Sequence, residues 1–550
     1  MAFGDMAVIQ PVLHANLMPH QVDVVRKACN KQQFLIAHEQ GTGKTITGIM
    51  LAKSALASGA KQVLVVCPPS LTFNWVQEFA KWAPEVSTTI LNKRAPLDTE
   101  KTPCAGLPDA QVIIATDGAW AGYNPWFIGG EQKFTWDEVW AKDSKGKYVK
   151  DAKGRKMRRL NDDLSIFEPT YITRDFGRGV DALIVDECQR VSSGRAGRGL
   201  AYTHFCASRP AMPKWLLSGT PFTKTRVGLY NLMDGLNVFG SHMVDGVKAD
   251  GKAWLKHFAP VASSYGARGQ ANTEQLHAEM FDAINGWAHR VLTADVITDL
   301  PNMGRILRNA ELTGVKARDY KRAETDLQQW LIDTRGSVKA ERMMKAEALI
   351  KVQELRRLCG QAKVESVIAQ VELTLESAEE GDHDPVLVVC SHTDVREAIM
   401  AHFKKTGLRV GTIHGGMDTA SKQDTVNAWQ AGLLDVVVAN VISSSVGFTM
   451  TNGRHIVFAE MPWNSMDCVQ AEARLLRKGQ TRDVVSQVMV GVQSNGNRTI
   501  DDRLWGLLKG KFAEAKAVLD GEMVEDMVSD ESIAWAVLRT YAEDMGVSLD

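Results

Sequence analysis

The sequence lacks the features of a secreted, membrane-spanning or disulfide-stapled protein. Its eight cysteines include no C-x-x-C pair, so neither a zinc module nor a disulfide framework is expected, and reduced thiols in the cytosol are the simpler interpretation. No apolar run reaches about 18 residues, the length needed to cross a bilayer. The N-terminus has no basic flank followed by an apolar core, so we expect no signal peptide.

Net charge is also almost absent. The 64 Lys and Arg residues against 65 Asp and Glu residues give a net charge of -1. This balance excludes a uniformly basic nucleic-acid coat, so any site for a polyanion must be a local patch. The charge is unevenly distributed, because residues 141–160 contain nine Lys or Arg and two Asp, whereas residues 518–550 contain nine Asp or Glu and one Arg.

What the sequence does have is short apolar runs in two regions, residues 10–237 and 384–508, that alternate with helical stretches. Runs that end in polar or Gly-rich residues are typical of parallel strands buried on both faces, with function at their carboxyl ends. The block between them, residues 240–379, has mainly the apolar period of helices. The predicted strands are 34–37, 63–67, 112–115, 182–185, 215–217, 386–390, 410–413, 436–439, 456–459 and 484–490.

The clearest motif is E-Q-G-T-G-K-T at 39–45, between a predicted strand and a predicted helix. Glycines let the backbone N–H groups face a phosphate, and the helix N-terminus adds its positive dipole. Lys44 would reach the β- and γ-phosphates, and the Thr45 hydroxyl would bind Mg²⁺. His38 stands where the full motif has its first Gly, and a Gly-rich turn without a ligand is the alternative. The residues expected to bind nucleotide here are Glu39, Gln40, Gly41, Thr42, Gly43, Lys44 and Thr45.

An acidic pair, Asp186 and Glu187, ends the predicted strand at 182–185. Two carboxylates at the end of a buried strand are costly unless they serve a cation or a proton. Asp186 suits Mg²⁺ bound through a water, and Glu187 suits polarising an attacking water. A strand that runs into a solvated acidic turn is the alternative.

The run Q-A-E-A-R-L-L-R-K-G-Q at 470–480 predicts a helix in the second region. Gln470, Arg474 and Arg477 would share one face of it, at i, i+4 and i+7. Two Arg on one face can contact a γ-phosphate and act as an arginine finger. An exposed basic helix with salt bridges is the alternative, although it does not explain why Gln470 joins the same face.

These three elements, in this order, resemble the superfamily 2 helicase-like ATPases. The residues within the individual motifs are similar to those of the Swi/Snf-type DNA translocases, and most similar to those of their annealing-helicase (HARP-like) branch. The resemblance covers residues 15–510. The further segments that carry it are L-M-P-H-Q at 17–21 (Q motif), S-L-T-F-N-W-V-Q-E-F-A-K-W at 70–82 (motif Ia), L-S-G-T-P at 217–221 (motif III), V-V-C-S-H at 388–392 (motif IV) and F-A-E-M-P-W-N at 458–464.

The resemblance implies an α/β fold of two RecA-like parallel-sheet lobes with an intervening mainly helical insertion. Gln21 would read the adenine edge, and Gly447 would lie near the nucleotide. Residues that would couple the motifs are Gln189, Ser218, Gly219, Thr220 and Gln470. Residues that would lie near the DNA backbone are Ser70, Trp75, Thr116, His392, Ser443 and Ser444. For Trp75, stacking on bases and packing in the core both remain open.

Two departures from the family pattern affect these roles. Gln189 replaces the usual His of motif II, and Gln can donate a hydrogen bond but cannot carry a proton. The run Ser443–Ser445 replaces a small-Gly-Gly run of motif V, which puts the ribose and DNA contacts of that loop in doubt.

The sequence as a whole predicts an ATP-driven translocase on double-stranded or branched DNA, using ATP and Mg²⁺, with a role such as DNA repair. No membrane and no zinc are expected, and we expect a monomer in the cytoplasm, associated with a nucleoid or, for a viral protein, with host cytoplasm. A strand-separating DNA or RNA helicase is one alternative. An ATP-gated DNA clamp or scaffold that does not translocate is another.

The predicted domains are an ATP-binding lobe at 1–237 with a basic insertion at 125–178, a helical insertion at 238–379, a second lobe at 380–510 and an acidic helical extension at 511–550. Residues 147–159 predict a β-hairpin that contacts DNA, with a solvated loop as the alternative. Its DNA-binding candidates are Lys150, Arg155, Lys156 and Arg158. We expect the acidic extension to pack a helix through its apolar side, and competition with DNA is the alternative.

Overall fold

The structure of the chain, a computed structural model, describes most of both predicted lobes. The residues that it describes are 12–13, 16–91, 109–120, 131–132, 171–172, 180–193, 197–221, 226–239, 243–244, 247–248, 284–297, 299–333, 341–377, 383–440, 448–463, 465–509 and 533–546. Among them, no helix combines the length and the apolar composition needed to cross a bilayer.

The chain divides into two compact units. Unit 1 comprises Met1–Leu35, Thr45–Leu217 and Tyr230–Gly240, and unit 2 comprises Ile36–Lys44, Ser218–Leu229 and Ser241–Asp550. Within unit 2, the short segment Ile36–Lys44 contacts a strand of later sequence, because the Glu39 N–H donates to Val291 O at 3.0 Å.

A seven-stranded sheet has the strand order β11-β1-β8-β7-β2-β4-β3. Its pairings of β2 with β4 and β7, of β3 with β4 and of β7 with β8 are parallel. Every residue of β2, β4 and β7 is buried, as expected for parallel strands covered on both faces. The strands are β1 (Gln33–His38), β2 (Val63–Cys67), β3 (Thr88–Leu91), β4 (Val112–Thr116), β7 (Ala182–Asp186), β8 (Lys214–Leu217) and β11 (Ala288–Val291).

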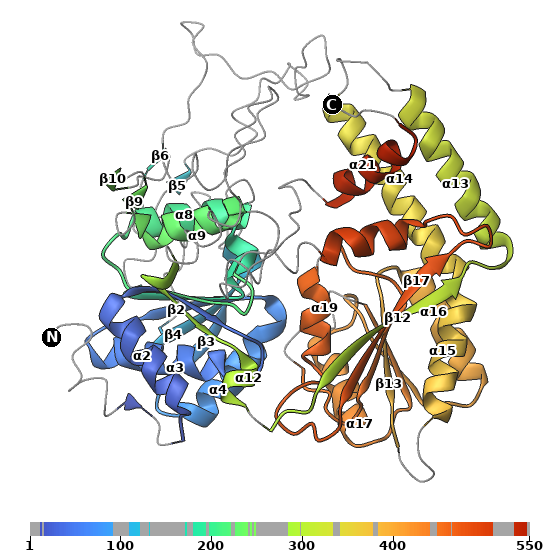
Figure 1. Cartoon of the computed structure of the whole chain (residues 1–550). Helices are drawn as coiled ribbons and strands as arrows, with labels where there is room; N and C mark the ends of the chain where they lie inside the picture. Colours follow the sequence, from blue (N-terminus) through green and yellow to red (C-terminus); the bar gives the residue numbers. More distant parts are fainter. Residues whose placement is uncertain are drawn as a thin grey trace, which may run out of the picture. The chain divides into compact units, whose positions relative to one another are not determined.

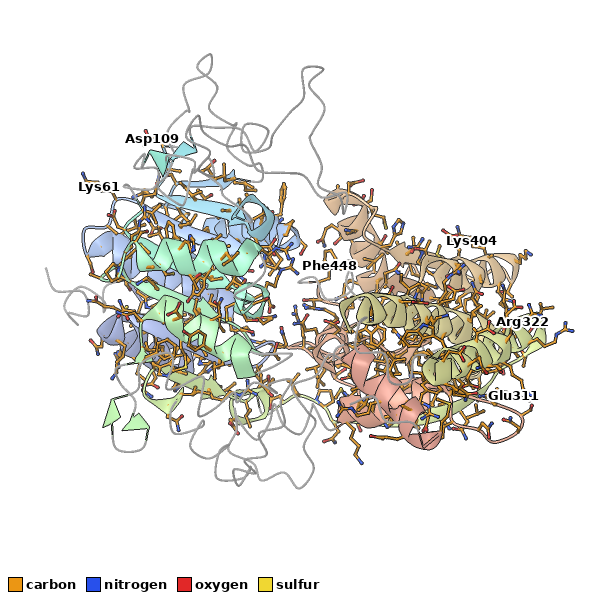
Figure 2. All side chains as sticks on the ribbon, turned by 90° about the horizontal axis from the view of Figure 1, so that it is seen from above. Lys61, Asp109, Glu311, Arg322, Lys404 and Phe448 are labelled. Carbon is orange, nitrogen blue, oxygen red and sulfur yellow. The ribbon has the colours of Figure 1, made fainter. Side chains whose placement is uncertain are left out.

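The helices that alternate with these strands include α2, α3 and α4, which lie next to the sheet, and α8 and α9, which lie side by side (Figure 1). Lys61 and Asp109 precede β2 and β4 and mark the edge at which these strands begin (Figure 2). The helices are α2 (Pro19–Lys31), α3 (Lys44–Ala57), α4 (Thr72–Trp82), α5 (Asp117–Trp120), α8 (Gly197–Ala207) and α9 (Arg226–Leu236), with 3-10 turns η2 (Pro69–Leu71) and η3 (Cys188–Val191).

A six-stranded sheet has the order β12-β17-β16-β13-β15-β14, and all of its pairings are parallel. Two short antiparallel pairs complete the described strands: β5 (Glu131–Gln132) with β6 (Tyr171–Ile172), and β9 (Met243–Val244) with β10 (Val247–Lys248). The six strands are β12 (Met303–Glu311), β13 (Val386–Cys390), β14 (Val410–Ile413), β15 (Val436–Asn440), β16 (His455–Phe458) and β17 (Val484–Val492).

The six-stranded sheet carries a separate apolar cluster on each face. Leu387 and Val389 of β13 join the cluster that contains Tyr320, whereas Val386 and Val388 join the cluster that contains Phe403. This split follows from the two-residue period of a strand. The associated helices are α13 (Gly314–Asp333), α14 (Glu341–Ala362), α15 (Val364–Glu376), α16 (Thr393–Lys405), α17 (Thr419–Gln430), α19 (Ser465–Glu472), residues 500–509, and α21 (Ile533–Asp544), whereas the short α12 (Thr293–Val296) follows β11.

The acidic extension packs its helix, as predicted. Val537, Leu538 and Tyr541 of α21 are at most 1% exposed, and α21 lies against α13 and α14 (Figure 1). The Tyr541 hydroxyl donates to Glu324 Oε1 at 3.0 Å, and the Arg503 guanidinium lies 3.9 Å from the Tyr541 ring centroid.

Every predicted strand is present within two residues at either end, which confirms an α/β fold of two parallel sheets. Where the structure describes residues 240–379, they are mainly helical, as predicted, but the block also contains the strands β9, β10, β11 and β12, which were not predicted. β12 was missed because it contains polar and charged residues, such as Arg305 and Arg308, and so has no apolar run. The strand is mostly exposed and pairs with β17. The short strand β3 was not predicted either.

Candidate active site

The phosphate loop, residues 39–43, leaves the carboxyl end of β1 and leads into α3, which begins at Lys44. Gly41 and Gly43 have φ of 83° and 84°, a left-handed conformation that favours Gly. Lys44 Nζ donates to Glu39 O at 2.8 Å, and Thr42 Oγ1 donates to the same oxygen at 2.9 Å. The loop therefore folds around one of its own carbonyls, with the Lys44 ammonium held against it.

His38, which replaces the first Gly of the motif, does not disturb this loop. It is the last residue of β1 and is 0% exposed. Its Nε2 lies 2.9 Å from Nδ1 of His289 on β11, and the two ring centroids are 5.2 Å apart. The side chain is accommodated by a neighbouring strand, so the missing Gly leaves the phosphate loop intact.

The acidic pair lies at the end of β7. Asp186 is the last residue of the strand, and Glu187 has φ 52° and ψ 52°, a left-handed conformation. This conformation costs a non-Gly residue about 1–3 kcal/mol and is characteristic of functional sites. Asp186 Oδ1 accepts from the Glu187 N–H at 2.9 Å, and Gln189 Nε2 donates to Glu187 Oε2 at 2.6 Å. Both carboxylates are therefore oriented by bonds within the turn.

Trp75, predicted to contact DNA, lies instead in the core, where its side chain is 0% exposed. Its Nε1 donates to Asp186 Oδ2 at 2.9 Å. The ring also lies against Gly48 of α3, where an added Cβ would come within 2.6 Å of it. A buried indole N–H needs an acceptor, and Asp186 supplies it. The DNA-contact prediction is wrong for Trp75, which holds the acidic pair.

A buried thiol, Cys67, lies near the carboxylates at this edge of the sheet. Cys67 ends β2, the neighbour of β7. Burial raises the pKa of the Cys67 thiol, and the negative charges of Asp186 and Asp117 raise it further. Carboxylate and hydroxyl oxygens are ligands that Mg²⁺ accepts. Asp186 and Thr45 are therefore chemically suited to this ion.

The loop Ser218–Thr220 follows β8 and lies beside the phosphate loop. The Ser218 N–H donates to Ile36 O at 3.1 Å, and Ser218 Oγ accepts from the Thr220 N–H at 2.9 Å. A Cβ on Gly219 would come within 3.2 Å of His38 O, so the close approach requires Gly. The predicted coupling residues of this loop thus adjoin the strand that carries the phosphate loop.

The predicted helix at 470–480 is wrong beyond Glu472, where α19 ends. The backbone then tightens, because the Arg474 N–H donates to Ala471 O at 3.1 Å and the Leu475 N–H donates to Glu472 O at 3.0 Å. Gln480 Nε2 holds the segment by donating to Gly453 O at 2.9 Å. Tertiary hydrogen bonds, which the sequence pattern does not reveal, therefore replace the last turns of the expected helix.

The two candidate arginines differ as a result. Arg474 is 2% exposed, and its carbonyl accepts from the Met450 N–H at 2.9 Å. Arg477 is half-buried, with Nη1 donating to Thr449 Oγ1 at 3.2 Å and Nε donating to Ala473 O at 2.9 Å. Gln470, expected on the same face, is 8% exposed. Arg477 is the more accessible of the two guanidinium groups.

His392 is held by a carboxylate that sequence reasoning did not assign. Its ring Nδ1 pairs with Glu460 Oε1, and the N–H groups of Ser391 and His392 donate to Glu460 Oε2 at 2.8 and 2.9 Å. A Cβ on Gly360 would come within 2.5 Å of Glu460. The Glu in F-A-E-M-P-W could have signalled this role, since a charge directly after a strand needs a partner.

The other predicted residues have mixed outcomes. Thr116 is 5% exposed and its Oγ1 accepts from the Ala119 N–H at 3.1 Å, and its DNA contact stays a prediction. Ser70, in η2, is half-buried and stays a candidate. Gln21 Oε1 accepts from the Met18 N–H at 2.9 Å at the start of α2. The predicted residues outside the described ones are Lys150, Arg155, Lys156, Arg158, Ser443, Ser444 and Gly447.

Comparison with known proteins assigns the family. Residues 20–364 match the family described as SNF2-related domain, and residues 363–479 match the Helicase conserved C-terminal domain. The chain belongs to the SNF2-related family. The two matches meet between α14 and α15, so the SNF2-related match takes in the seven-stranded sheet, β12 and the first long helices of unit 2.

Several SNF2-related relatives align with nearly the whole chain. The human protein named DNA annealing helicase and endonuclease ZRANB3 is 24% identical over 515 residues, which is 92% of this chain and 41% of the relative. A Caenorhabditis elegans homologue of SWI/SNF-related matrix-associated actin-dependent regulator of chromatin subfamily A-like protein 1 is 26% identical, over 92% of this chain and 62% of its own. The chain therefore spans about half the length of these relatives.

Among solved structures, the Sulfolobus solfataricus SWI2/SNF2 ATPase core in complex with dsDNA is 18% identical, with a TM-score of 0.34, over 97% of this chain and 98% of that chain. The same core domain solved separately gives a TM-score of 0.34 as well.

Proposed function

We propose that this SNF2-related chain is an ATP-driven translocase on double-stranded DNA. The observation that carries the proposal is one parallel sheet with a Gly-built phosphate loop ending in Lys44 and a strained acidic turn at Asp186 and Glu187. These features follow β1 and β7, the two strands that flank β8. A phosphate-binding Lys, a cation-binding Asp and a water-positioning residue are the recurring parts of P-loop hydrolysis.

Each residue of the proposed site has a separate task. Lys44 would leave the Glu39 carbonyl to neutralise the β- and γ-phosphates, and the N-terminus of α3 would add its dipole. Glu187, oriented by Gln189, would polarise the attacking water. Thr45 and Asp186 would hold Mg²⁺, which bridges the phosphates and neutralises developing charge.

The proposed arginine finger is Arg477. It is the less buried of the two candidates, and its guanidinium already donates to hydroxyl and carbonyl oxygens. Oxygens of a γ-phosphate would be stronger acceptors for the same donors, because both partners would be charged. Arg474 would support the segment from inside. Gln21 and Gly447 would complete the nucleotide contacts, and Gln189, Ser218, Gly219, Thr220 and Gln470 would couple the motifs.

The proposed partner is duplex DNA, with branched DNA as its finer form. Support comes from the name of one relative, a DNA annealing helicase and endonuclease. Ser70, His392 and the basic segment at 141–160 would contact phosphates, which carry no sequence information and so suit a motor that slides. We propose a monomer in the cytoplasm or nucleoid, with the four domains bounded at 237, 379 and 510.

Displacement of a third strand from a triplex distinguishes this function from its alternatives. The chain should remove the third strand in an ATP-dependent manner while leaving forked duplexes unseparated. Separation of a plain duplex fork would favour a strand-separating helicase. DNA-stimulated ATP binding without displacement or turnover would favour a clamp.

A further inference from the structure

A segment within the block at 238–379, β11 and α12, contacts the phosphate loop directly. The Glu39 N–H donates to Val291 O at 3.0 Å, and Thr293 Oγ1 donates to Gln40 O at 2.7 Å. The Thr293 N–H donates to Glu39 Oε2 at 2.9 Å. Two successive residues of the loop are therefore held by backbone and hydroxyl groups of a segment about 250 residues later in the sequence.

Arg290 of β11 contacts three parts of this region at once. Its Nη1 donates to Ala37 O at 2.8 Å and to Gly219 O at 3.1 Å, and its Nη2 pairs with Glu39 Oε1 at 3.2 Å. The side chain is 17% exposed, so these bonds are largely shielded from water. One guanidinium thus joins the end of β1, the phosphate loop and the Ser218–Thr220 loop.

An Arg is better suited than a Lys to this set of contacts, because its donors are spread over a planar group. The planar guanidinium carries five donors in a fixed fork, whereas a Lys ammonium is a compact point charge. The Glu39 carboxylate, with Arg290 on one oxygen and the Thr293 N–H on the other, cannot turn toward a nucleotide without losing both bonds. We therefore assign Glu39 a supporting position in the loop, in place of direct nucleotide contact.

The same segment continues directly into the six-stranded sheet. α12 ends at Val296, and β12 begins at Met303 and pairs with β17 along its whole length. Figure 1 shows this stretch of chain between the labels α12 and β12. Few residues therefore separate, along the chain, the segment that contacts the phosphate loop from an edge strand of the six-stranded sheet.

We propose that Arg290 is a positioning residue that fixes the phosphate loop and the Ser218–Thr220 loop as one body, and that residues 288–296 link the nucleotide state to β12. The proposal rests on the proposed translocase function. It assigns a task to a segment that lies outside the sequence motifs of the site.

Arg290→Lys tests whether the planar guanidinium of Arg290 is needed for these contacts, and Arg454→Lys is its matched control. Arg454 is also a partly buried Arg of unit 2 paired with a carboxylate, with Nε donating to Asp384 Oδ2 at 2.6 Å, but it does not belong to the nucleotide loops. Affinity for a fluorescent ADP analogue without DNA, and third strands displaced per ATP hydrolysed, are measured for both. We expect Arg290→Lys to weaken nucleotide binding about tenfold and to lower displacement per ATP at least threefold, with Arg454→Lys near wild type in both.

Thr293→Val and Thr293→Ser provide a second test should Arg290→Lys fold poorly. Valine removes the hydroxyl donor to Gln40 O and keeps the backbone N–H to Glu39, whereas serine keeps both. Nucleotide affinity should fall with valine and return with serine. Wild-type affinity and displacement per ATP in Arg290→Lys, or in Thr293→Val, would overturn the proposal. A wild-type chain that hydrolyses no ATP would instead overturn the proposed function and leave the loop contacts to be judged by nucleotide affinity.

Discussion

The nucleotide loops of the seven-stranded sheet are the phosphate loop (residues 39–43) and the acidic turn at Asp186 and Glu187, and the arginine segment of unit 2 is residues 470–480. Different interactions hold these two regions in their conformations. The loops depend on backbone conformation, with left-handed residues at Gly41, Gly43 and Glu187. The arginine segment depends on side chains from elsewhere, above all Gln480. Backbone conformation leaves a visible motif, because few residues tolerate positive φ. Tertiary hydrogen bonds leave no such pattern. The conformation of the nucleotide loops could therefore be predicted from the sequence, whereas that of the arginine segment could not.

In the nucleotide loops, we expect the largest loss of activity from a substitution of Lys44. Lys44→Ala should lower DNA-stimulated ATPase by about 10³-fold or more and weaken ATP binding, because it removes the charge facing the β/γ-phosphates. Lys53→Ala is the control, since Lys53 lies on the same helix and pairs with Glu85 at 2.8 Å. Steady-state ATPase and nucleotide titration measure both. Turnover of Lys44→Ala equal to that of the control would refute the phosphate-loop assignment.

In the arginine segment, we expect the largest loss of activity from a substitution of Arg477. Arg477→Ala should lower kcat on the order of 10³-fold with a smaller change in KM, because an arginine finger acts on transition-state charge. Arg409→Ala, which removes an exposed pair with Asp435, should leave both constants unchanged. A raised KM with unchanged kcat would make Arg477 a binding residue only.

A substitution of Gln480, which holds the arginine segment in place, should lower activity less. Gln480→Ala removes bonds to the carbonyls of Thr451, Gly453 and Leu475. Each net hydrogen bond is worth about 1 kcal/mol, so we expect a loss of about 1–3 kcal/mol in stability and about a tenfold fall in kcat. Gln493→Ala, which removes one bond to Glu324, should cost stability without lowering kcat. Equal kcat values for the two variants would show that Gln480 does not position Arg477.

An effect of similar size concerns the support of the acidic pair. Trp75→Phe removes the donor to Asp186 Oδ2 and should raise the Mg²⁺ concentration needed for tight ATP binding by about tenfold. Trp215→Phe is the matched control, because Trp215 is also 0% exposed and donates through Nε1 to Ala28 O at 3.0 Å. Both variants should lose stability, but only Trp75→Phe should alter the Mg²⁺ dependence. A matching shift in the control would point to general loosening of unit 1.

Much of the fold could be predicted from the sequence, because fully buried parallel strands such as Val63–Cys67 are continuous apolar runs. β12 could not, since an edge strand that exposes Arg308 has no apolar run or clean alternation. For the candidate site, local motifs were enough to single out Lys44 and Asp186, whose roles stay predictions. Trp75 was misassigned and Arg290 missed, because their partners lie 111 and 251 residues away in sequence. Only the folded chain brings these groups together.

The central claim, hydrolysis of ATP at the acidic pair, is tested most directly by Glu187→Gln. The amide oxygen of the glutamine can still accept from Gln189, so the turn should persist while the water is no longer polarised. The measurement is DNA-stimulated phosphate release together with ATP affinity in the same preparation. We predict wild-type ATP affinity with turnover lowered by at least 10²-fold. Near-normal turnover in this variant would contradict the account.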